Sequence, residues 1–245
     1  MRFNKYVYQN MKKTLLITFA LLVVTALHAQ YFSTNEGAEL VYVNYDSAGQ
    51  STSTETVTVK SVTKERGAVS AVYMDKIVNQ KSKNNTSYTR YLWTYSDGTT
   101  TCTEDLMYGP YIDGDSDPDI YNEEIMEALK SDCKFKGDNS FTLLDGIYGG
   151  ESIADRSYSY TSNMLKNEIT ISGASYLAPE MVSTTAGNFT CLKVSFLQQT
   201  KITVRKETIR VNEWYAKGIG LVKREVYNTK GALKSKTVIT KITEK

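Results

Sequence analysis

The chain has 245 residues, of which 41% are apolar and 23% are charged, the composition of a globular domain and not of a disordered segment. Its formal net charge is +2, which excludes a strongly basic field of the kind that binds nucleic acid. It contains three cysteines and one histidine, so there is little material for histidine-based chemistry.

The N-terminal stretch MKKTLLITFALLVVTALHAQ has the three parts of a secretory signal peptide. Lys12 and Lys13 form the positive part, Leu15 to Val24 form the apolar part, and small residues lead to a cleavage point after Ala29. The apolar run is shorter than the roughly twenty residues of a membrane span. We therefore predict a signal peptide over residues 1–29.

Met11 is the more natural start of this signal, in which case residues 1–10 are not translated. No cysteine lies at the cleavage point, so a lipid-modified N-terminus is not expected. The remaining residues, 30–245, are predicted to form a single β-rich domain that is exported to the periplasm or secreted.

Signal removal changes the chemistry of the chain. Residues 1–29 hold four of the 29 basic residues and none of the 27 acidic ones, so the mature chain has a net charge of −2. His28, the only histidine, is also removed. This excludes Ser-His-Asp and Cys-His catalysis, zinc sites with histidine ligands and a histidine pH switch. Mechanisms that use carboxylates alone or a Ser-Lys pair remain open, but no motif indicates them, so we expect no enzymatic activity.

The mature chain alternates apolar and polar residues, the pattern of half-buried antiparallel strands. The alternating segments are AELVYVNYD, TETVTVKSVT, AVSAVYMDKIV, YTRYLWTYS, NEITIS, TCLKVSFLQQ, KITVRKETIRVNEWYA, GLVKREVYN and LKSKTVITKI. Turn sequences separate them: DSAG at Asp46, SDG at Ser96, AKG at Ala216 and NTKG at Asn228. Asp46 and Asn228 each follow a tyrosine and precede a glycine by three residues, which predicts two similar hairpins at related positions of one sheet.

An acidic stretch, IDGDSDPDIYNEE, is the candidate metal site of the sequence. The carboxylates Asp113, Asp115, Asp117, Asp119 and Glu124 follow the ligand spacing of a calcium-binding EF-hand loop. Pro118 stands where that loop needs a glycine, and no entering helix precedes it. The alternatives are a looser calcium loop and a solvated acidic turn.

One short helix is predicted over residues 122–130. Asn122 is a suitable N-cap, and acidic residues follow it at the positive end of the helix dipole. Ile125, Met126 and Leu129 form its apolar side.

The three cysteines are Cys102, Cys133 and Cys191. If a disulfide forms, the pair that flanks the acidic loop, Cys102 and Cys133, is the preferred one. Cys191 lies in an apolar alternating run and is expected to be a small buried side chain.

Two further segments invite a functional interpretation. The segment KITVRKETIR is a local basic patch, but its charges alternate in sign, which is typical of the exposed face of a strand. The segment KGIG at Lys217 lacks the third glycine and the helix of a nucleotide-binding loop and favours a tight hairpin. The eighteen tyrosines and two tryptophans could stack on sugars or line an apolar cavity, although strands use such residues routinely.

These patterns predict an all-β fold: a single strongly curved antiparallel sheet or an incomplete β-barrel of roughly ten strands, with one short helix. Three segments, YFSTNEGAELVYVNYDSAGQ, STTAGNFTCLKVSF and VNEWYAKGIGLVKREVYNTKGALKSKTVITKI, resemble a family of secreted Gram-negative proteins of unknown function that is sometimes labelled TapB-like. That family is related to a broader domain of unknown function. The resemblance implies an open barrel of the lipoprotein-carrier type, and it provides no catalytic residues to carry over to this chain.

Two functions follow as hypotheses. In the first, the chain is a non-enzymatic envelope protein whose curved sheet holds an apolar or amphipathic ligand such as a lipid. In the second, side chains of the chain fill the interior, and its loops bind an envelope protein. No cofactor other than calcium, no nucleic acid and no transmembrane span after signal cleavage are expected.

Overall fold

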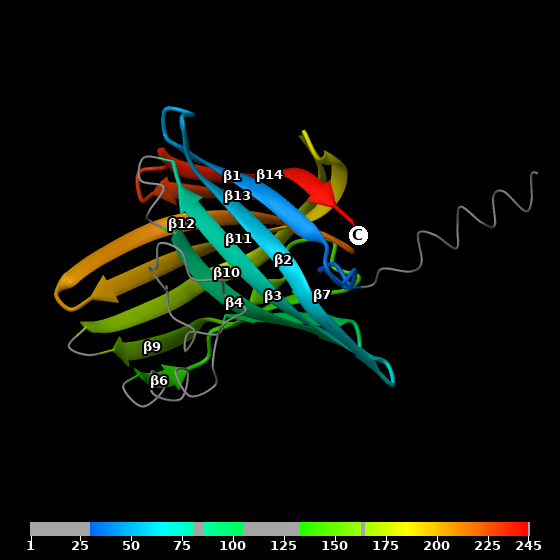
Figure 1. Ribbon diagram of the computed structural model, residues 1–245. Helices are drawn as coiled ribbons and strands as arrows, with labels where there is room; N and C mark the ends of the chain where they lie inside the picture. The colour runs from blue at the N-terminus through cyan, green and yellow to red at the C-terminus, as the bar shows by residue number, and fades with distance from the viewer. Residues whose placement is uncertain (1–29, 81–85, 105–132, 163–164, 245) are drawn as a thin grey trace, which may run out of the picture.

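The computed structural model describes residues 30–80, 86–104, 133–162 and 165–244 (Figure 1). All regular structure in these ranges is β-strand. The strands are β1 (Glu39–Asp46), β2 (Ser51–Glu65), β3 (Ala68–Asn79), β4 (Thr86–Ser96), β5 (Thr99–Glu104), β6 (Cys133–Gly137), β7 (Ser140–Leu144), β8 (Ser152–Ile153), β9 (Arg156–Ser162), β10 (Leu165–Thr184), β11 (Gly187–Ile202), β12 (Arg205–Ala216), β13 (Gly220–Asn228) and β14 (Leu233–Thr243).

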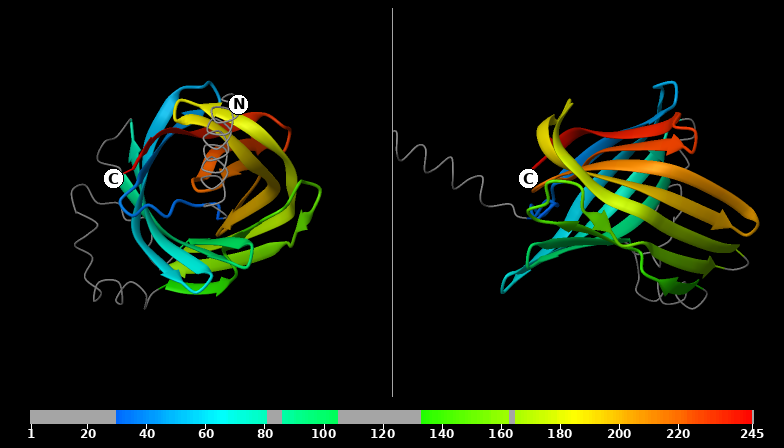
Figure 2. Two further views of the ribbon diagram at one scale, coloured as in Figure 1. Left: turned by 90° about the vertical axis from the view of Figure 1, so that its right-hand side faces the viewer. Right: turned by 180° about the vertical axis from the view of Figure 1, so that it is seen from behind.

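These fourteen strands form one antiparallel sheet, in place of the roughly ten strands expected from the sequence. Its order is β6-β9-β10-β11-β12-β13-β14-β1-β2-β3-β4-β5-β7, and β8 pairs with β10 beside β9. The sheet curls round a central axis so far that it forms a ring in end view (Figure 2). Its two edge strands, β6 and β7, do not pair with each other, so the barrel is not closed. The prediction of an all-β, strongly curved single sheet is confirmed.

The predicted helix at 122–130 lies outside the described residues. Within the described ranges there is no helix at all, and therefore none that is long and apolar enough to cross a membrane.

The two edges of the sheet are consecutive in the chain. β6 lies beside β9, β7 lies beside β5, and only Asp138 and Asn139 separate them. The Asp138 amide donates to the Ser157 carbonyl at 3.2 Å, and the Asn139 side-chain amide donates to the Glu104 carbonyl at 2.6 Å. This two-residue link therefore bonds to both sides of the gap and substitutes for the missing strand pairing.

Gly137 precedes this link and allows the close approach of β6 to β9. A Cβ atom placed on Gly137 would lie 2.3 Å from the Ser157 carbonyl oxygen, and its φ is +98°. We expect Gly137→Ala to lower the free energy of unfolding by about 2–4 kcal/mol, through backbone strain and overpacking together. Urea unfolding measures this, with Gly49→Ala as the control, because Gly49 has a φ of +77° but open space around it. Equal losses in the two variants would contradict the steric explanation.

The two predicted hairpins are confirmed and lie side by side, because β1 pairs with β14. In the first, the Asp46 carboxylate accepts the amides of Ala48 and Gln50, each at 2.9 Å. In the second, the Asn228 side-chain oxygen accepts the corresponding amides two and four residues on, at 2.9 and 3.0 Å. The similar sequences thus build the same turn twice, at the same end of the sheet.

One end of the curled sheet is filled. Residues 30–38 run across the interior there and form the plug of the barrel (Figure 2, left). Phe32 is completely buried and stacks on Trp93 with ring centroids 5.8 Å apart. The Tyr31 amide donates to the Thr100 hydroxyl at 3.1 Å, and the Gly218 amide donates to the Gln30 carbonyl at 2.8 Å. The plug is therefore part of the hydrophobic core.

Candidate functional site

The interior beyond the plug is hollow. A cavity of about 360 Å³ lies between β4, β5, β7, β9 to β13, and a smaller one of about 100 Å³ adjoins it toward β1 to β3. Both are lined by Tyr91, Cys102, Tyr215 and Arg224. The larger volume is at the lower end of the range for small-molecule sites. Among the described residues, the interior thus has one filled end and one hollow end.

Every second residue of each strand faces the interior, and on β12 and β13 these inward residues include charged as well as apolar side chains. On β12, Ile209, Val211, Glu213 and Tyr215 all line the cavity. On β13, Arg224 lies between Val222, which is buried, and Val226. The cavity wall is consequently mixed in polarity and not uniformly apolar.

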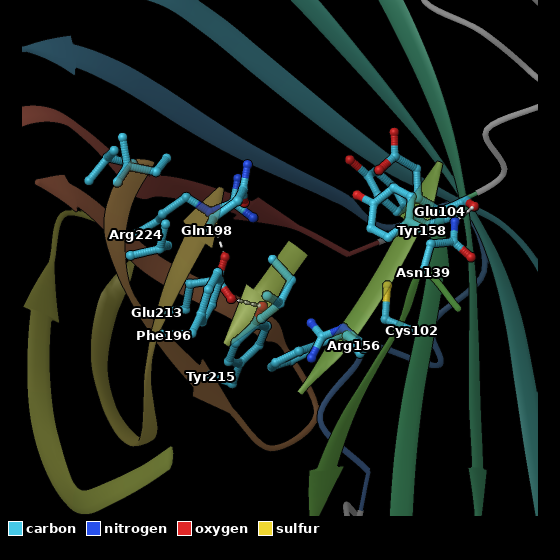
Figure 3. Close-up of a pocket in the computed structure, with 16 residues that line it drawn as sticks. Cys102, Glu104, Asn139, Arg156, Tyr158, Phe196, Gln198, Glu213, Tyr215 and Arg224 are labelled. Carbon is cyan, nitrogen blue, oxygen red and sulfur yellow. Dashed lines mark hydrogen bonds and ion pairs between the residues drawn. The ribbon is translucent and has the colours of Figure 1, made fainter. Parts of the chain in front are cut away.

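Arg224 and Glu213 form an ion pair across the β12–β13 ladder, with Nε and Oε1 2.6 Å apart. The Tyr215 hydroxyl donates to the other oxygen of Glu213 at 2.7 Å, and Figure 3 shows the three side chains linked in a row. The Arg224 side chain keeps 46% of its surface accessible because it borders the hollow interior. Glu213 raises the pKa of Arg224, and burial raises the pKa of Tyr215. Both groups therefore hold their protons at any physiological pH.

A pair of acidic residues, Asp75 and Glu55, lies next to this row. The Asp75 carboxyl is buried and hydrogen-bonds to Glu55, and its Oδ1 has no hydrogen-bond partner among the described residues. Burial, and then the charge of Glu55, raise the pKa of Asp75 to about 9, against a weaker opposing effect of Arg224. Asp75 is therefore protonated at neutral pH and can donate a hydrogen bond to Glu55.

Three hydrogen-bond donors of the cavity wall have no partner among the described residues. The Arg156 guanidinium contacts the Phe141 ring at 5.6 Å, but its buried Nε donates to no protein atom and it forms no ion pair. Figure 3 shows it among the residues that line the cavity. The Tyr91 and Tyr158 hydroxyls also line the cavity without a hydrogen bond, and burial raises the pKa of Tyr158 to about 12. Unpaired donors facing a cavity are free to bind the acceptor of a ligand.

Most other interior tyrosines are structural. The hydroxyls of Tyr42, Tyr73 and Tyr176 donate to main-chain carbonyls at 2.8, 2.7 and 2.9 Å. The Tyr95 hydroxyl donates to Asp145 at 3.0 Å. These groups hold neighbouring segments together, as the routine use of tyrosine in strands predicted.

Both tryptophans are also used in packing. Trp93 stacks on the plug, whereas Trp214 lies on the outer face of β12. The ammonium groups of Lys193 and Lys223 lie 4.6 and 4.2 Å from the Trp214 ring, and its indole N–H donates to Glu180. Trp214 is 2% exposed, so its ring is not available to stack on a sugar.

The preferred disulfide, Cys102 to Cys133, is wrong: Cys102 is a free thiol. Its strand, β5, places it on the cavity wall, whereas β6, which carries Cys133, pairs with β9 at the opposite edge of the sheet. Burial raises the pKa of the Cys102 thiol well above its usual range. Cys191 is free and fully buried, as predicted.

The acidic loop lies outside the described residues, with Asp113, Asp115, Asp117, Asp119 and Glu124. Calcium binding there stays a prediction. In the rest of the chain, as far as the structure describes it, no three metal-ligating side chains come together. The KGIG segment forms the β12–β13 hairpin turn, in agreement with its interpretation.

The charged residues of the interior were not identified from the sequence, although a signal exists for three of them. Asp75, Glu213 and Arg224 each occupy the apolar phase of an alternating strand: Asp75 follows Tyr73 by two residues, and Arg224 lies two residues from Val222 and Val226. A charged side chain at such a position must point into the interior, as the neighbouring apolar side chains do. Arg156 carries no such signal, because its strand, RSYSYTS, lacks a clear apolar alternation.

A family model described as DUF3108-like matches residues 144–239. The match includes the second of the three segments that carried the resemblance and all but the last three residues of the third, and it supports the resemblance to a family of unknown function. No curated protein is significantly similar to the chain.

Two crystal structures share the fold. One is a protein of Bacteroides fragilis, named as a predicted exported protein with a YmcC-like fold, with a TM-score of 0.66 and 21% identity. The other, from Parabacteroides distasonis, is named as a predicted lipoprotein, with a TM-score of 0.66 and 18% identity. Each alignment covers 87% of this chain and 98% of the other. Neither name indicates an enzymatic activity.

Proposed function

We propose that this chain is an exported, non-enzymatic binding protein that holds an amphipathic ligand in the hollow end of its curled sheet. The proposal rests on one observation: hydrogen-bond donors without a partner and apolar side chains line the same cavity. Arg156, Tyr91 and Tyr158 offer free N–H and O–H groups, and Ile171, Phe196 and Val211 line the same cavity. A ligand with a polar acceptor group and a hydrocarbon part satisfies both.

The charged lining narrows the ligand class. A purely apolar ligand would bury the guanidinium of Arg156 against hydrocarbon, at the cost of a desolvated and unpaired charge. Arg224 is already paired with Glu213, so Arg156 is the cation left for a ligand. A carboxylate or phosphate head group would form a charge-assisted hydrogen bond with it.

Titration with a fluorescent fatty acid and with its methyl ester tests this site. We expect Arg156→Gln to weaken binding of the acid by about 1.5–3 kcal/mol, roughly tenfold to a hundredfold, because it removes a hydrogen bond to a charged group. The methyl ester lacks the charge, so the same substitution should weaken its binding less. Arg66→Gln, on the exposed turn between β2 and β3, is the matched control and should bind like the wild type.

Mass spectrometry of a denaturing extract of the protein, purified from its own envelope, should show a co-purified amphiphile. If neither the acid nor the ester binds and the extract contains no ligand, the binding proposal is wrong. Native mass spectra recorded with and without a chelator also test the predicted calcium loop, since a bound ion would be lost on chelation.

An interaction module with a self-filled interior is the second candidate. The plug favours it, because residues 30–38 fill one end of the interior and bury Phe32 completely. A protein that carries no ligand, binds no amphiphile and is captured with an envelope partner would support this second function.

A further inference from the structure

The β11–β12 hairpin extends farther than its neighbours at the hollow end of the molecule. Both side views show its tip projecting there (Figures 1 and 2). The basic segment KITVRKETIR, interpreted from the sequence as part of one strand, is this tip: β11 ends at Ile202 and β12 begins at Arg205. That interpretation was wrong because the turn, Thr203 and Val204, contains none of the usual turn residues.

The tip of the hairpin is apolar and exposed. Val204 is 93% exposed, the largest exposed fraction among the large apolar side chains of the described residues, and Ile202 is 45% exposed. Thr203 adopts a φ of +53°, which is unfavourable for a β-branched residue. A glycine or asparagine would relieve this strain, and a polar residue would solvate the tip better.

The flanks of the tip are basic. Lys201 and Lys206 lie directly opposite each other in the β11–β12 ladder, which places like charges side by side. Lys201 is partly neutralised by Glu168, 3.1 Å away, but neither Arg205 nor Lys206 has an ion-pair partner among the described residues. The hairpin therefore combines an exposed apolar end with three cations just behind it, of which Lys201 is paired with Glu168 and Arg205 interacts with the charge of Glu207.

We propose that this hairpin docks on the surface of an anionic lipid bilayer, with Val204 and Ile202 entering the interface and Lys201, Arg205 and Lys206 contacting the head groups. Apolar residues flanked by cations are the usual composition of interfacial membrane contacts, and no matching shape is needed. Two apolar side chains are too few for the core of a stable protein interface. Docking at this tip orients the hollow end of the sheet toward the membrane.

Vesicle co-sedimentation of the purified mature protein tests the proposal. We expect binding to phosphatidylcholine vesicles that contain phosphatidylglycerol, with less binding to phosphatidylcholine alone and less at high salt. Val204→Asp should weaken the vesicle affinity roughly tenfold, because it removes the apolar tip and adds a repelled charge. Lys206→Glu should weaken it in a salt-dependent manner.

Two control variants separate the tip from general surface effects. Met181 is 66% exposed near the end of β10 that pairs with the start of β11, away from the hairpin tip, so Met181→Asp should leave vesicle binding unchanged. Lys64→Glu, near the β2–β3 turn, has the same charge change as Lys206→Glu. All four variants alter exposed positions, so circular dichroism should show wild-type folding.

Vesicle binding that is absent, or equally reduced in the tip and control variants, overturns the proposal. Crosslinking of Val204 to an envelope protein in the absence of vesicle binding would also overturn it and assign the tip to a protein partner. The proposal is independent of the cavity ligand: vesicle binding tests the hairpin, whereas the fatty-acid titration tests the cavity.

Discussion

Phe32→Ala is expected to lower the free energy of unfolding by about 3–5 kcal/mol, the usual loss for a fully buried phenylalanine. The side chain is completely buried, and its stacking on Trp93 adds to the contribution of its buried area. The plug closes one end of the sheet, so the space left by the ring cannot collapse without moving main-chain segments that Tyr31 and Ser33 anchor. The loss should therefore lie in the upper part of this range.

Chemical denaturation monitored by circular dichroism measures the effect as a lower midpoint with an unchanged slope. Tyr148→Ala is the control, because Tyr148 is an aromatic residue that is 81% exposed, and its loss should change stability by less than about 0.5 kcal/mol. A change below about 1 kcal/mol in Phe32→Ala would show that the plug does not belong to the cooperative core.

The sequence predicted the strands whose inner faces are apolar. Eight of the nine alternating segments each fall on one strand, because a half-buried face leaves a period of two in the chain, whereas the ninth, KITVRKETIRVNEWYA, contains the β11–β12 turn. The segments around β5 to β9 were not recognised. β5, TTTCTE, is almost entirely polar, and β6 and β7 are five residues each, too short for a periodic pattern.

The way in which the two edges of the sheet are linked without closing the barrel was the least predictable feature. It depends on a two-residue link that joins β6 to β7 across the gap, and on hydrogen bonds from Asp138 and Asn139 to strands far away in the sequence. The cavity was not predicted either, because its prediction requires knowing which strands face one another across the interior. Glu213 and Arg224 are opposite each other only because β12 pairs with β13 in one register.

Asp75→Asn is expected to stabilise the protein at neutral and mildly alkaline pH and to have little effect near pH 4. The pKa of Asp75 is raised from 3.8 to about 9, first by burial and then by Glu55. Between these two values the folded state holds a proton that the unfolded state has released. Stability therefore falls as pH rises, with a slope of up to about 1.4 kcal/mol per pH unit for one proton.

The stability contributed by the protonated carboxyl is thus fully present below about pH 4 and is lost as pH rises through about 9. An asparagine amide has nearly the same shape, donates to Glu55 without a proton to lose and removes this dependence. Urea unfolding of the wild type and of Asp75→Asn at several pH values measures the difference. Glu65→Gln, at an exposed position next to the β2–β3 turn, serves as the control.

Parallel stability profiles of the wild type and Asp75→Asn would contradict a protonated Asp75 in the folded state. A difference that grows with pH would establish it, and the interior, as far as the structure describes it, would then contain a neutral carboxyl beside Glu55 and an unpaired cation, Arg156. That charge balance matters for binding. Glu104 and Glu55 also line the two cavities, and Glu213 is paired with Arg224. Deprotonation of Asp75 would add a negative charge beside Glu55, so alkaline pH should weaken binding of an anionic head group as well as stability.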